Sequence, residues 1–376
     1  MLSALLLVTL QVASPTDAPA DARARAAAAV EAWLAAGRAP GVSAALAFPD
    51  GDTWAVCAGV TDPAGGRALA PDDRLLAGSV GKTFVAATAL ALVAEGRLDI
   101  DAPVGERLGR EPWFERLPNA EGLTLRHLLT HRSGLPRYVF APAFTRDLAA
   151  DPERTFAPAE LLAYVFDAEP RFAPGAGFAY SDTNYLVAGL CIEHAAGATL
   201  YAEVERRFLA PLELAGTIPS DRRVLPGLVQ GHTGRPDPLG LPPRVLDAEG
   251  RFAINPQFEW AGGGFASTPR DLARWARALY GGRALDLERT SILLDAQPAP
   301  ELGRDVGYGM AAIAWPGPGG AHVGHSGFFP GYLTEVRYWP EHDVAIAVQV
   351  NTSDARRLGR PISALAGALL ELALER

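Results

Sequence analysis

Lysine, cysteine and methionine are nearly absent from this chain of 376 residues. Lys82 is the only lysine among 34 basic residues, and cysteine and methionine occur twice each. Two cysteines cannot form a disulfide framework, so we expect Cys57, in an apparent strand, and Cys191, in an apparent helix, to be buried free thiols. The net charge of −9 argues against the basic surface that a nucleic-acid partner requires, so we expect none.

Apolar runs long enough to span a membrane are also missing. The first 20 residues, MLSALLLVTLQVASPTDAPA, contain an apolar run of about a dozen residues, the length of a signal-peptide core. Ala18, Pro19 and Ala20 offer a cleavage site of the A-x-A type, although no Lys or Arg precedes the apolar run. We therefore expect residues 1–20 to be a signal peptide, the protein to be periplasmic or secreted, and the mature chain to have no membrane span.

Strand patterns are found towards the two ends of the chain. Two apolar segments flank Pro49-Asp50-Gly51-Asp52, whose residues favour a hairpin turn. Further segments with strand character come late in the chain, at 308–315, 331–339 and 343–350. Helical patterns accompany them, at 21–37, at 84–96 with Gly96 as terminator, and at 361–376.

The middle of the chain, about residues 100–260, shows several short helical patterns and no long alternating run. One sheet assembled from both chain ends explains this distribution. We therefore predict an α/β (α+β) domain over residues 21–376. Its sheet-containing lobe comes from about 21–100 and 260–376, and the middle forms an inserted, mostly helical lobe.

The single lysine follows a serine by three residues, at the start of an expected helix. This spacing puts Ser79 and Lys82 on one face, with about 5–6 Å between their Cβ atoms. A serine hydroxyl is a weak nucleophile until a neighbouring base takes its proton. Lysine can be that base if burial or nearby positive charge lowers its pKa, whereas arginine stays protonated. The pair predicts a nucleophile and its base, with the backbone N–H of Ser79 facing a developing oxyanion.

Two other interpretations apply to the same segment. GSVGKT resembles the end of a phosphate-binding loop, but the first glycine of that motif would fall at position 76, which is leucine. Alternatively, Ser79 only caps the helix and Lys82 is a solvated side chain. Two further segments bear on this choice.

The first of these segments is Tyr180-Ser181-Asp182. A tyrosine beside a cationic lysine can serve as a second proton shuttle, so Tyr180 is a candidate catalytic residue. Asp182 can hold Lys82 in place. The simpler alternative is a helix start that Ser181 or Asp182 caps.

The second segment is His325-Ser326-Gly327-Phe328, on an expected edge strand. Gly327 would let a substrate backbone approach, and the N–H of Phe328 would supply a second oxyanion donor. GHSGF differs from the nucleophile elbow G-x-S-x-G at Phe328, and no helix follows it, so Ser326 is a poor nucleophile candidate.

Ser-x-x-Lys at 79–82, Tyr-Ser-Asp at 180–182 and His-Ser-Gly at 325–327 together resemble the active-site elements of the serine β-lactamase and penicillin-binding protein superfamily. The similarity is to the branch of class C β-lactamases, D-alanyl-D-alanine carboxypeptidases and related esterases. It extends to LTLRHLLTHRSGLP (123–136) and AGGGFASTPRDLARWARALYGG (261–282). The resemblance implies the β-lactamase/DD-peptidase-like fold, in which helices flank an antiparallel sheet.

The resemblance also implies roles for the matching residues. Ser79 would be the acylated nucleophile, and Lys82 and Tyr180 would move protons, with either one as the base. The amides of Ser79 and Phe328 would form the oxyanion hole. Asp182, His325, Ser326, Gly327 and Phe328 would form the substrate-binding set, and no cofactor is implied.

Two departures from the β-lactamase pattern shape the expected activity. Asp182 replaces the usual asparagine, and an ionised aspartate cannot donate a hydrogen bond to a substrate carbonyl. His325 replaces lysine and is mostly neutral at pH 7. We therefore expect a serine hydrolase for a small-molecule or peptide substrate, an esterase or D-amino-acid peptidase rather than an efficient β-lactamase. The alternative is a penicillin-binding sensor that is acylated without turnover.

A metal site is not expected. His127 and His131 have the i,i+4 spacing of zinc ligands, but Leu128 stands where a zinc protease carries glutamate. We expect these histidines to serve packing and capping.

Overall fold

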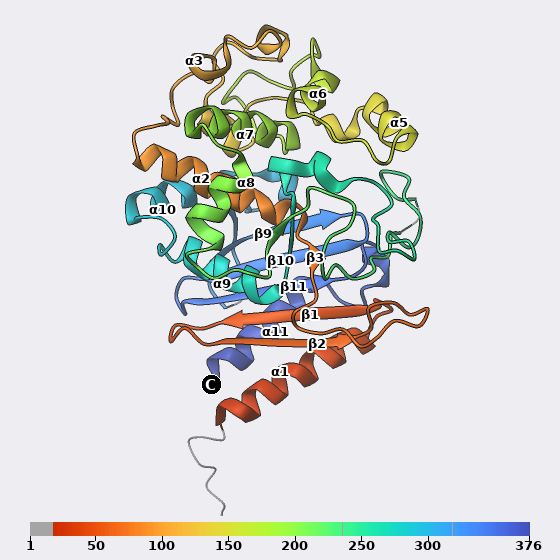
Figure 1. Cartoon of the computed structure of the whole chain (residues 1–376). Coiled ribbons are helices and arrows are strands. Elements are labelled where there is room, and N and C mark those ends of the chain that lie inside the picture. The colour runs from red at the N-terminus through yellow and green to blue at the C-terminus, as the bar shows by residue number, and fades with distance from the viewer. Residues whose placement is uncertain (1–17, 235, 318) are drawn as a thin grey trace, which may run out of the picture.

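A hairpin from the amino end of the chain joins a sheet built by the carboxyl end (Figure 1). The computed structural model describes residues 18–234, 236–317 and 319–376, so most of the predicted signal peptide lies outside the described residues. The sheet has eight strands in the order β2-β1-β11-β10-β9-β8-β7-β6, and all neighbours are antiparallel. Their bounds are β1 Gly41–Ala47, β2 Thr53–Gly59, β6 Gln297–Pro298, β7 Gly307–Tyr308, β8 Ile313–Trp315, β9 His322–Phe329, β10 Tyr332–Trp339 and β11 Val344–Val350.

The central strands β1 and β11 are buried along their whole length. Their register pairs Val42 with Val350 and Ala47 with Ala345. Both read as continuous apolar runs because helices cover the two faces of the sheet. Helix α9 (Pro269–Tyr280) packs on one face, and α1 (Ala18–Ala35) and α11 (Ile362–Leu374) pack on the other. The prediction of one antiparallel sheet assembled from both chain ends and flanked by helices is confirmed.

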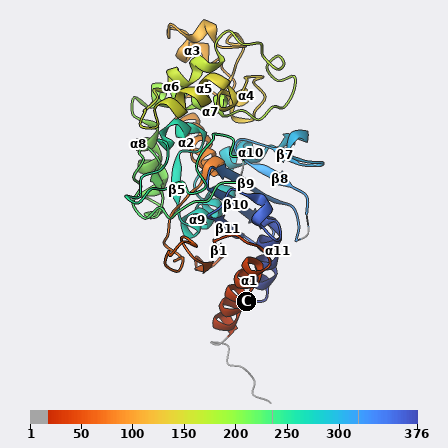
Figure 2. The ribbon, with the colours of Figure 1, turned by 90° about the vertical axis from the view of Figure 1, so that its right-hand side faces the viewer.

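The two terminal helices share one apolar core with the sheet. In Figures 1 and 2, α1 and α11 lie together on the side of the sheet away from the other helices. Buried side chains of both helices and of the strands form one cluster on this face. It includes Ala26, Val30 and Trp33 of α1, Leu365 and Leu369 of α11, and the strand residues Leu46, Ile346 and Val348. Burial of a large aliphatic or aromatic side chain contributes roughly 1.5–3 kcal/mol, so this layer fixes both chain ends to the sheet.

The opposite side of the sheet carries the remaining helices and the larger apolar core. Helices α2 (Lys82–Ala94) and α7 (Asp182–Ala196) pack against each other, and each has buried residues along most of its length. The other helices are shorter: α3 Gly105–Leu108, α4 Leu125–Leu129, α5 Pro142–Ala150, α6 Pro158–Leu162, α8 Leu200–Val204 and α10 Leu287–Leu294. A small sheet consists of β3 (Leu75–Leu76), β5 (Phe265–Ser267) and β4 (Ile218–Pro219), and β3 shortly precedes α2 in the chain.

Two details differ from the sequence prediction. Residues 308–315 form a hairpin rather than one strand. Residues 309–312 make the turn between β7 and β8, where Ala311 has a positive φ of 53° and the Gly309 N–H donates to the Ala312 carbonyl. Within the described part of 215–255, β4 is the only strand and no α-helix occurs. The division into two lobes stays a prediction.

The structure also tests the predictions for the two cysteines and for the turns. Both cysteines are free; Cys191 is buried, but Cys57 is only half-buried and donates to the Leu69 carbonyl. The hairpin turn lies between β1 and β2, and Gly96, at φ 69°, follows the end of α2. Within the described ranges, no helix combines the length and the hydropathy needed to cross a bilayer.

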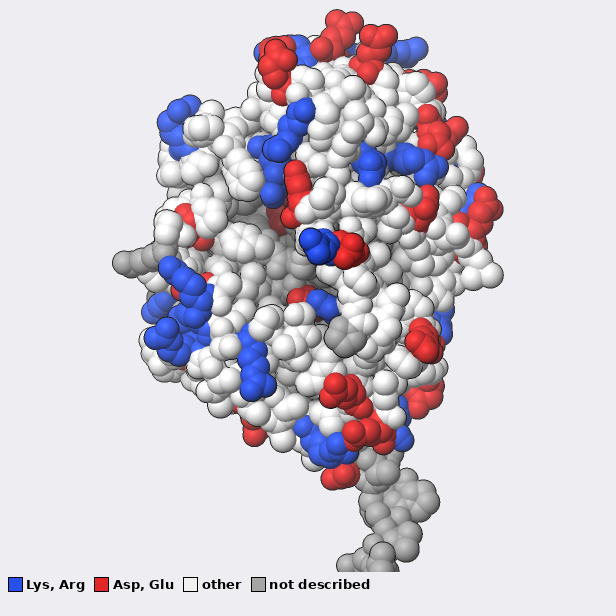
Figure 3. All heavy atoms as spheres, turned by 180° about the vertical axis from the view of Figure 1, so that it is seen from behind, with Lys and Arg blue, Asp and Glu red and all other residues white. Residues whose placement is uncertain are grey.

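The surface mixes charges of both signs. On the face shown in Figure 3, acidic and basic side chains are interspersed, and the middle of the face is hollowed.

Candidate active site

Ser79 lies in the 3₁₀ turn Gly78–Gly81, directly before α2. The turn touches the backbone of β9. A Cβ atom at Gly78 would lie 2.6 Å from the Phe328 carbonyl oxygen and 2.8 Å from the Phe328 nitrogen. Only glycine allows this approach, and its φ of 52° is in the left-handed region. The turn therefore brings the backbone of Phe328 close to the residue before Ser79.

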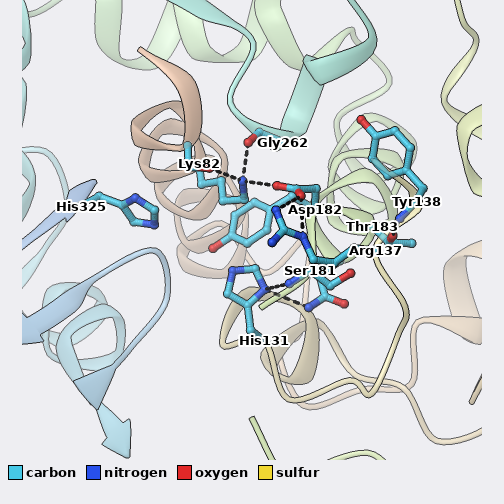
Figure 4. A network of polar contacts seen from close by, with 12 residues as sticks. Lys82, His131, Arg137, Tyr138, Ser181, Asp182, Thr183, Gly262 and His325 are labelled. Carbon is cyan, nitrogen blue, oxygen red and sulfur yellow. Dashed lines mark hydrogen bonds and ion pairs between the residues drawn. The ribbon is translucent and has the colours of Figure 1, made fainter. Parts of the chain in front are cut away.

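Neither half of the helix-cap alternative agrees with the structure. No side-chain hydrogen bond caps the 3₁₀ turn or α2, so Ser79 is not a capping residue. The Lys82 side chain is 0% exposed rather than solvated. Its Nζ lies 2.9 Å from Ser79 Oγ, 2.8 Å from Asp182 Oδ1 and 2.5 Å from the Gly262 carbonyl oxygen (Figure 4). An ammonium group has three N–H donors, and three acceptors surround this one.

Asp182, the first residue of α7, forms two ion pairs. Its Oδ1 accepts from Lys82, and its Oδ2 accepts from Arg137 Nη2 at 2.7 Å and Nε at 3.1 Å. Neither Ser181 nor Asp182 caps α7 with its side chain. The contact of Asp182 with Lys82 is thus part of the structure, whereas its contact with substrate stays a prediction.

Charge pairing sets the protonation of this cluster. Burial would raise the pKa of Asp182, but Lys82 and Arg137 hold it well below its usual range. Burial lowers the pKa of Lys82, yet the charge of Asp182 and its hydrogen bond raise it above the ordinary value. Lys82 is therefore an ammonium ion in the resting site. The lowered pKa that the sequence argument required of it is not found.

Tyr180 is brought next to the same lysine. Lys82 Nζ lies 5.1 Å from the centre of the Tyr180 ring. Burial raises the pKa of Tyr180 above its ordinary value, while the charge of Lys82 opposes this shift. The Tyr180 hydroxyl is buried and completes no hydrogen bond within the described residues. It is available for proton transfer.

His131 packs against Tyr180, with ring centres 4.0 Å apart. Its Nδ1 accepts from the Ser181 backbone N–H at 3.3 Å, and burial lowers its pKa well below 6.5. His127 accepts from the Thr124 N–H in a capping box at the start of α4. The prediction of packing and capping roles for these histidines is confirmed.

The third motif lies on β9, but its side chains point in different directions. His325 is buried and donates from Nδ1 to the Ser326 carbonyl, so its Nε2 accepts from Tyr308 Oη at 3.0 Å. Burial lowers the pKa of His325 to about 3. Both ring nitrogens are occupied and the ring is neutral, so it cannot pair with a substrate carboxylate as a cation. Ser326 and Phe328 are exposed.

Gly327 has a structural role that the sequence did not indicate. A Cβ atom there would lie 2.0 Å from the Ala77 carbonyl oxygen. Glycine at this position therefore allows β9 to approach the segment before Ser79, while its contact with substrate stays a prediction.

A cavity of about 360 Å³ opens beside Ser79. Its polar lining includes Asp182, Arg137 and Glu259. Its apolar lining includes Tyr138, Phe140, Leu239, Phe258, Phe328 and Phe329. The sequence prediction missed Arg137, Glu259 and Tyr308, none of which lies in a three-residue motif. Within the described residues, no group of three metal-ligating side chains is found.

The sequence profile of the Beta-lactamase family matches residues 26–368. The chain belongs to the Beta-lactamase family. The crystal structure of a D-stereospecific amidohydrolase from Streptomyces sp. is 30% identical in sequence, with a TM-score of 0.77; the match covers 92% of this chain and 98% of that one. This comparison confirms the β-lactamase/DD-peptidase-like fold.

Two curated relatives are hydrolases by name. The unguisins hydrolase ungD′ of Aspergillus campestris is 26% identical over 84% of this chain and 59% of its own length. Esterase EstB of Burkholderia gladioli is 30% identical over 49% of this chain and 48% of its own length. The chain thus spans about half of the length of these relatives.

Proposed function

We propose that the chain is a serine hydrolase that cleaves amide or ester carbonyls through an acyl-enzyme on Ser79. One observation carries the proposal: the fully buried ammonium of Lys82 lies 2.9 Å from Ser79 Oγ, and Ser79 lines a cavity large enough for a small acyl group. The hydrolases among its relatives support it.

The reaction has two steps. The reactive form is the one in which the Lys82–Tyr180 pair has first lost one proton to solvent. Ser79 Oγ then attacks the substrate carbonyl carbon, and its proton enters this deprotonated pair. The backbone amides of Ser79 and Phe328 hold the oxyanion. The leaving amine or alcohol takes that proton as its bond to the carbonyl carbon breaks. Water then attacks the acyl carbonyl carbon and gives a proton to the same pair. The pair passes this proton to Ser79 Oγ as the acyl bond breaks, and the acid leaves.

The cavity favours substrates with an apolar or aromatic acyl portion. Five aromatic side chains line it together with Leu239: Tyr138, Phe140, Phe258, Phe328 and Phe329. D-Amino-acid amides, esters and short peptides fit this lining, and the Streptomyces relative is D-stereospecific by name. Efficient β-lactam hydrolysis is not proposed, because His325 is neutral and bonded to Tyr308.

Burst kinetics test the proposal. We expect D-phenylalanine amide and a p-nitrophenyl ester to give sustained turnover, with L-phenylalanine amide and a chromogenic cephalosporin as comparison substrates. Ser79→Ala is the matched control and should lose turnover. One equivalent of product followed by arrest would instead identify an acylated sensor, and turnover that survives in Ser79→Ala would contradict the acyl-enzyme.

We also propose export of the protein to the periplasm or the medium. The apolar run within residues 1–20 supports this. Sequencing of the amino terminus after expression in a Gram-negative host should show a start near residue 21. A cytoplasmic chain that retains residues 1–20 would contradict export.

A further inference from the structure

Glu259 is an acidic side chain at the cavity that the reaction described above does not use. It lies in the 3₁₀ segment Pro256–Gly262 and lines the same cavity as Ser79. Gly263 makes room for its carboxyl group, because a Cβ atom there would lie 2.7 Å from Glu259 Oε1.

One oxygen of the Glu259 carboxyl group is left without a partner in the part of the chain that the structure describes. Its Oε2 is buried and forms no hydrogen bond among the described residues. The nearby cations already have a partner, because Lys82 and Arg137 both donate to Asp182. An unpaired buried carboxyl is costly to ionise, and native structures leave few such groups without a partner. Burial accordingly raises the pKa of Glu259 to about 8, against a smaller lowering by Lys82.

We propose that Glu259 binds the ammonium group of an amino-acid amide, ester or peptide with a free amino terminus. This inference rests on the proposed hydrolase and names a group that its substrates carry. An ammonium supplies the donors that Oε2 lacks, and the ion pair forms away from bulk water, where it is strong. The aromatic rings along the same cavity add cation–π attraction for the same group.

Two other carboxylates near Ser79 are less suited to this role. Both oxygens of Asp182 accept from Lys82 and Arg137. Glu301 accepts from the Tyr180 backbone N–H at 3.3 Å and lies 3.7 Å from Arg171, and its side chain is 43% exposed. Glu259 alone among the three has an unpaired buried oxygen.

A matched pair of esters tests the inference. D-Phenylalanine methyl ester and methyl 3-phenylpropanoate differ only in the amino group. In Glu259→Gln, kcat/KM for the amino ester should fall about 30-fold or more, mainly through KM, because loss of one partner of a buried charge pair is costly. For the ester without the amino group, kcat/KM should stay within about threefold. Glu301→Gln should leave the ratio of the two rates unchanged.

Equal losses for both esters in Glu259→Gln would overturn the inference, as would a change of the ratio in Glu301→Gln. If the native protein hydrolyses neither ester and Ser79 is not acylated, the proposed hydrolase fails as well. If Glu259→Gln does not fold, a binding measurement on the native protein still tests the inference. 2-Phenylethylamine should inhibit at least tenfold more strongly than 2-phenylethanol, and equal inhibition would contradict the ammonium site.

Discussion

Two sets of buried ionisable groups lie beside Ser79, and they differ in one respect. Lys82, Asp182 and Arg137 satisfy one another through ion pairs at 2.7–2.8 Å. Glu259 has a buried oxygen with no partner in residues 18–234, 236–317 and 319–376. Paired charges keep a fixed protonation state and a fixed geometry, whereas an unpaired carboxyl changes protonation when a cation arrives. The first set positions the reaction, and the second is open to a ligand.

The paired set is assembled from three separate parts of the chain. Lys82 begins α2, Asp182 begins α7, and Arg137 lies in the connection between α4 and α5. Removal of one partner from a buried ion pair leaves the other charge uncompensated, at a cost of roughly 3–5 kcal/mol. Variants of this set should therefore change both activity and stability, while variants of Glu259 should change recognition and the pH dependence of stability.

Replacement of Lys82 by arginine should have the largest effect on rate. Lys82→Arg keeps the positive charge but removes an amine that can exchange a proton with Ser79. General acid–base catalysis contributes about 10²–10⁴-fold, so kcat/KM should fall by that factor. Steady-state kinetics on a p-nitrophenyl ester provide the measurement.

The matched exchange is Arg137→Lys, which also keeps its charge next to Asp182. Arg137 contacts the carboxylate and does not contact Ser79 Oγ, so kcat/KM should stay within about tenfold. Folding of both variants is checked by circular dichroism. If folded Lys82→Arg retains a third of the native activity, charge alone is sufficient and the proton-transfer role is wrong.

Asp182→Asn should have an intermediate effect. The amide cannot balance Lys82 and Arg137, so the free energy of unfolding should fall by about 3 kcal/mol in urea titrations. Because both carboxylate oxygens already accept from these cations, the ratio of amide to ester turnover should not change. A raised amide-to-ester ratio would show that Asp182 contacts the substrate itself.

Glu259→Gln should change the pH dependence of stability. The pKa of Glu259 is about 8 in the folded chain and near 4.5 in the unfolded chain. Between these values the folded state holds one more proton, so stability of the native protein falls as pH rises, by about 1.4 kcal/mol per pH unit from this group.

The variant lacks this contribution. The difference in unfolding free energy, variant minus native, should therefore increase from pH 5 to pH 8 and then level off. A difference that is constant over this range would mean that Glu259 is ionised in the folded protein, and would remove the contrast with the paired set.

Much of the fold and part of the site could be predicted from the sequence. The strand character of the late segments, the turn at 49–52 and the Ser79–Lys82 spacing are local signals, so they could be recognised without a structure. Ion pairs between distant segments have no such signal. Arg137 and Asp182 are 45 residues apart, and nothing near Arg137 distinguishes it from the other arginines.

Two other features required the fold. The sequence argument placed Gly327 against substrate, whereas the contact with Ala77 becomes visible only when β9 lies beside the serine turn. The direction of the Lys82 pKa depends on which anions surround it, and the motif alone cannot supply them. For Glu259, the run of three glycines at 262–264 was an available signal of close backbone approach.

Covalent labelling tests the central claim most directly. A fluorophosphonate probe reacts with an activated serine, and intact-mass analysis with peptide mapping locates the adduct. We predict one equivalent on the native chain, located at Ser79, and none on Ser79→Ala. Labelling that persists in Ser79→Ala, or an adduct that maps to Ser326 on β9, would contradict the assignment of Ser79 as the nucleophile.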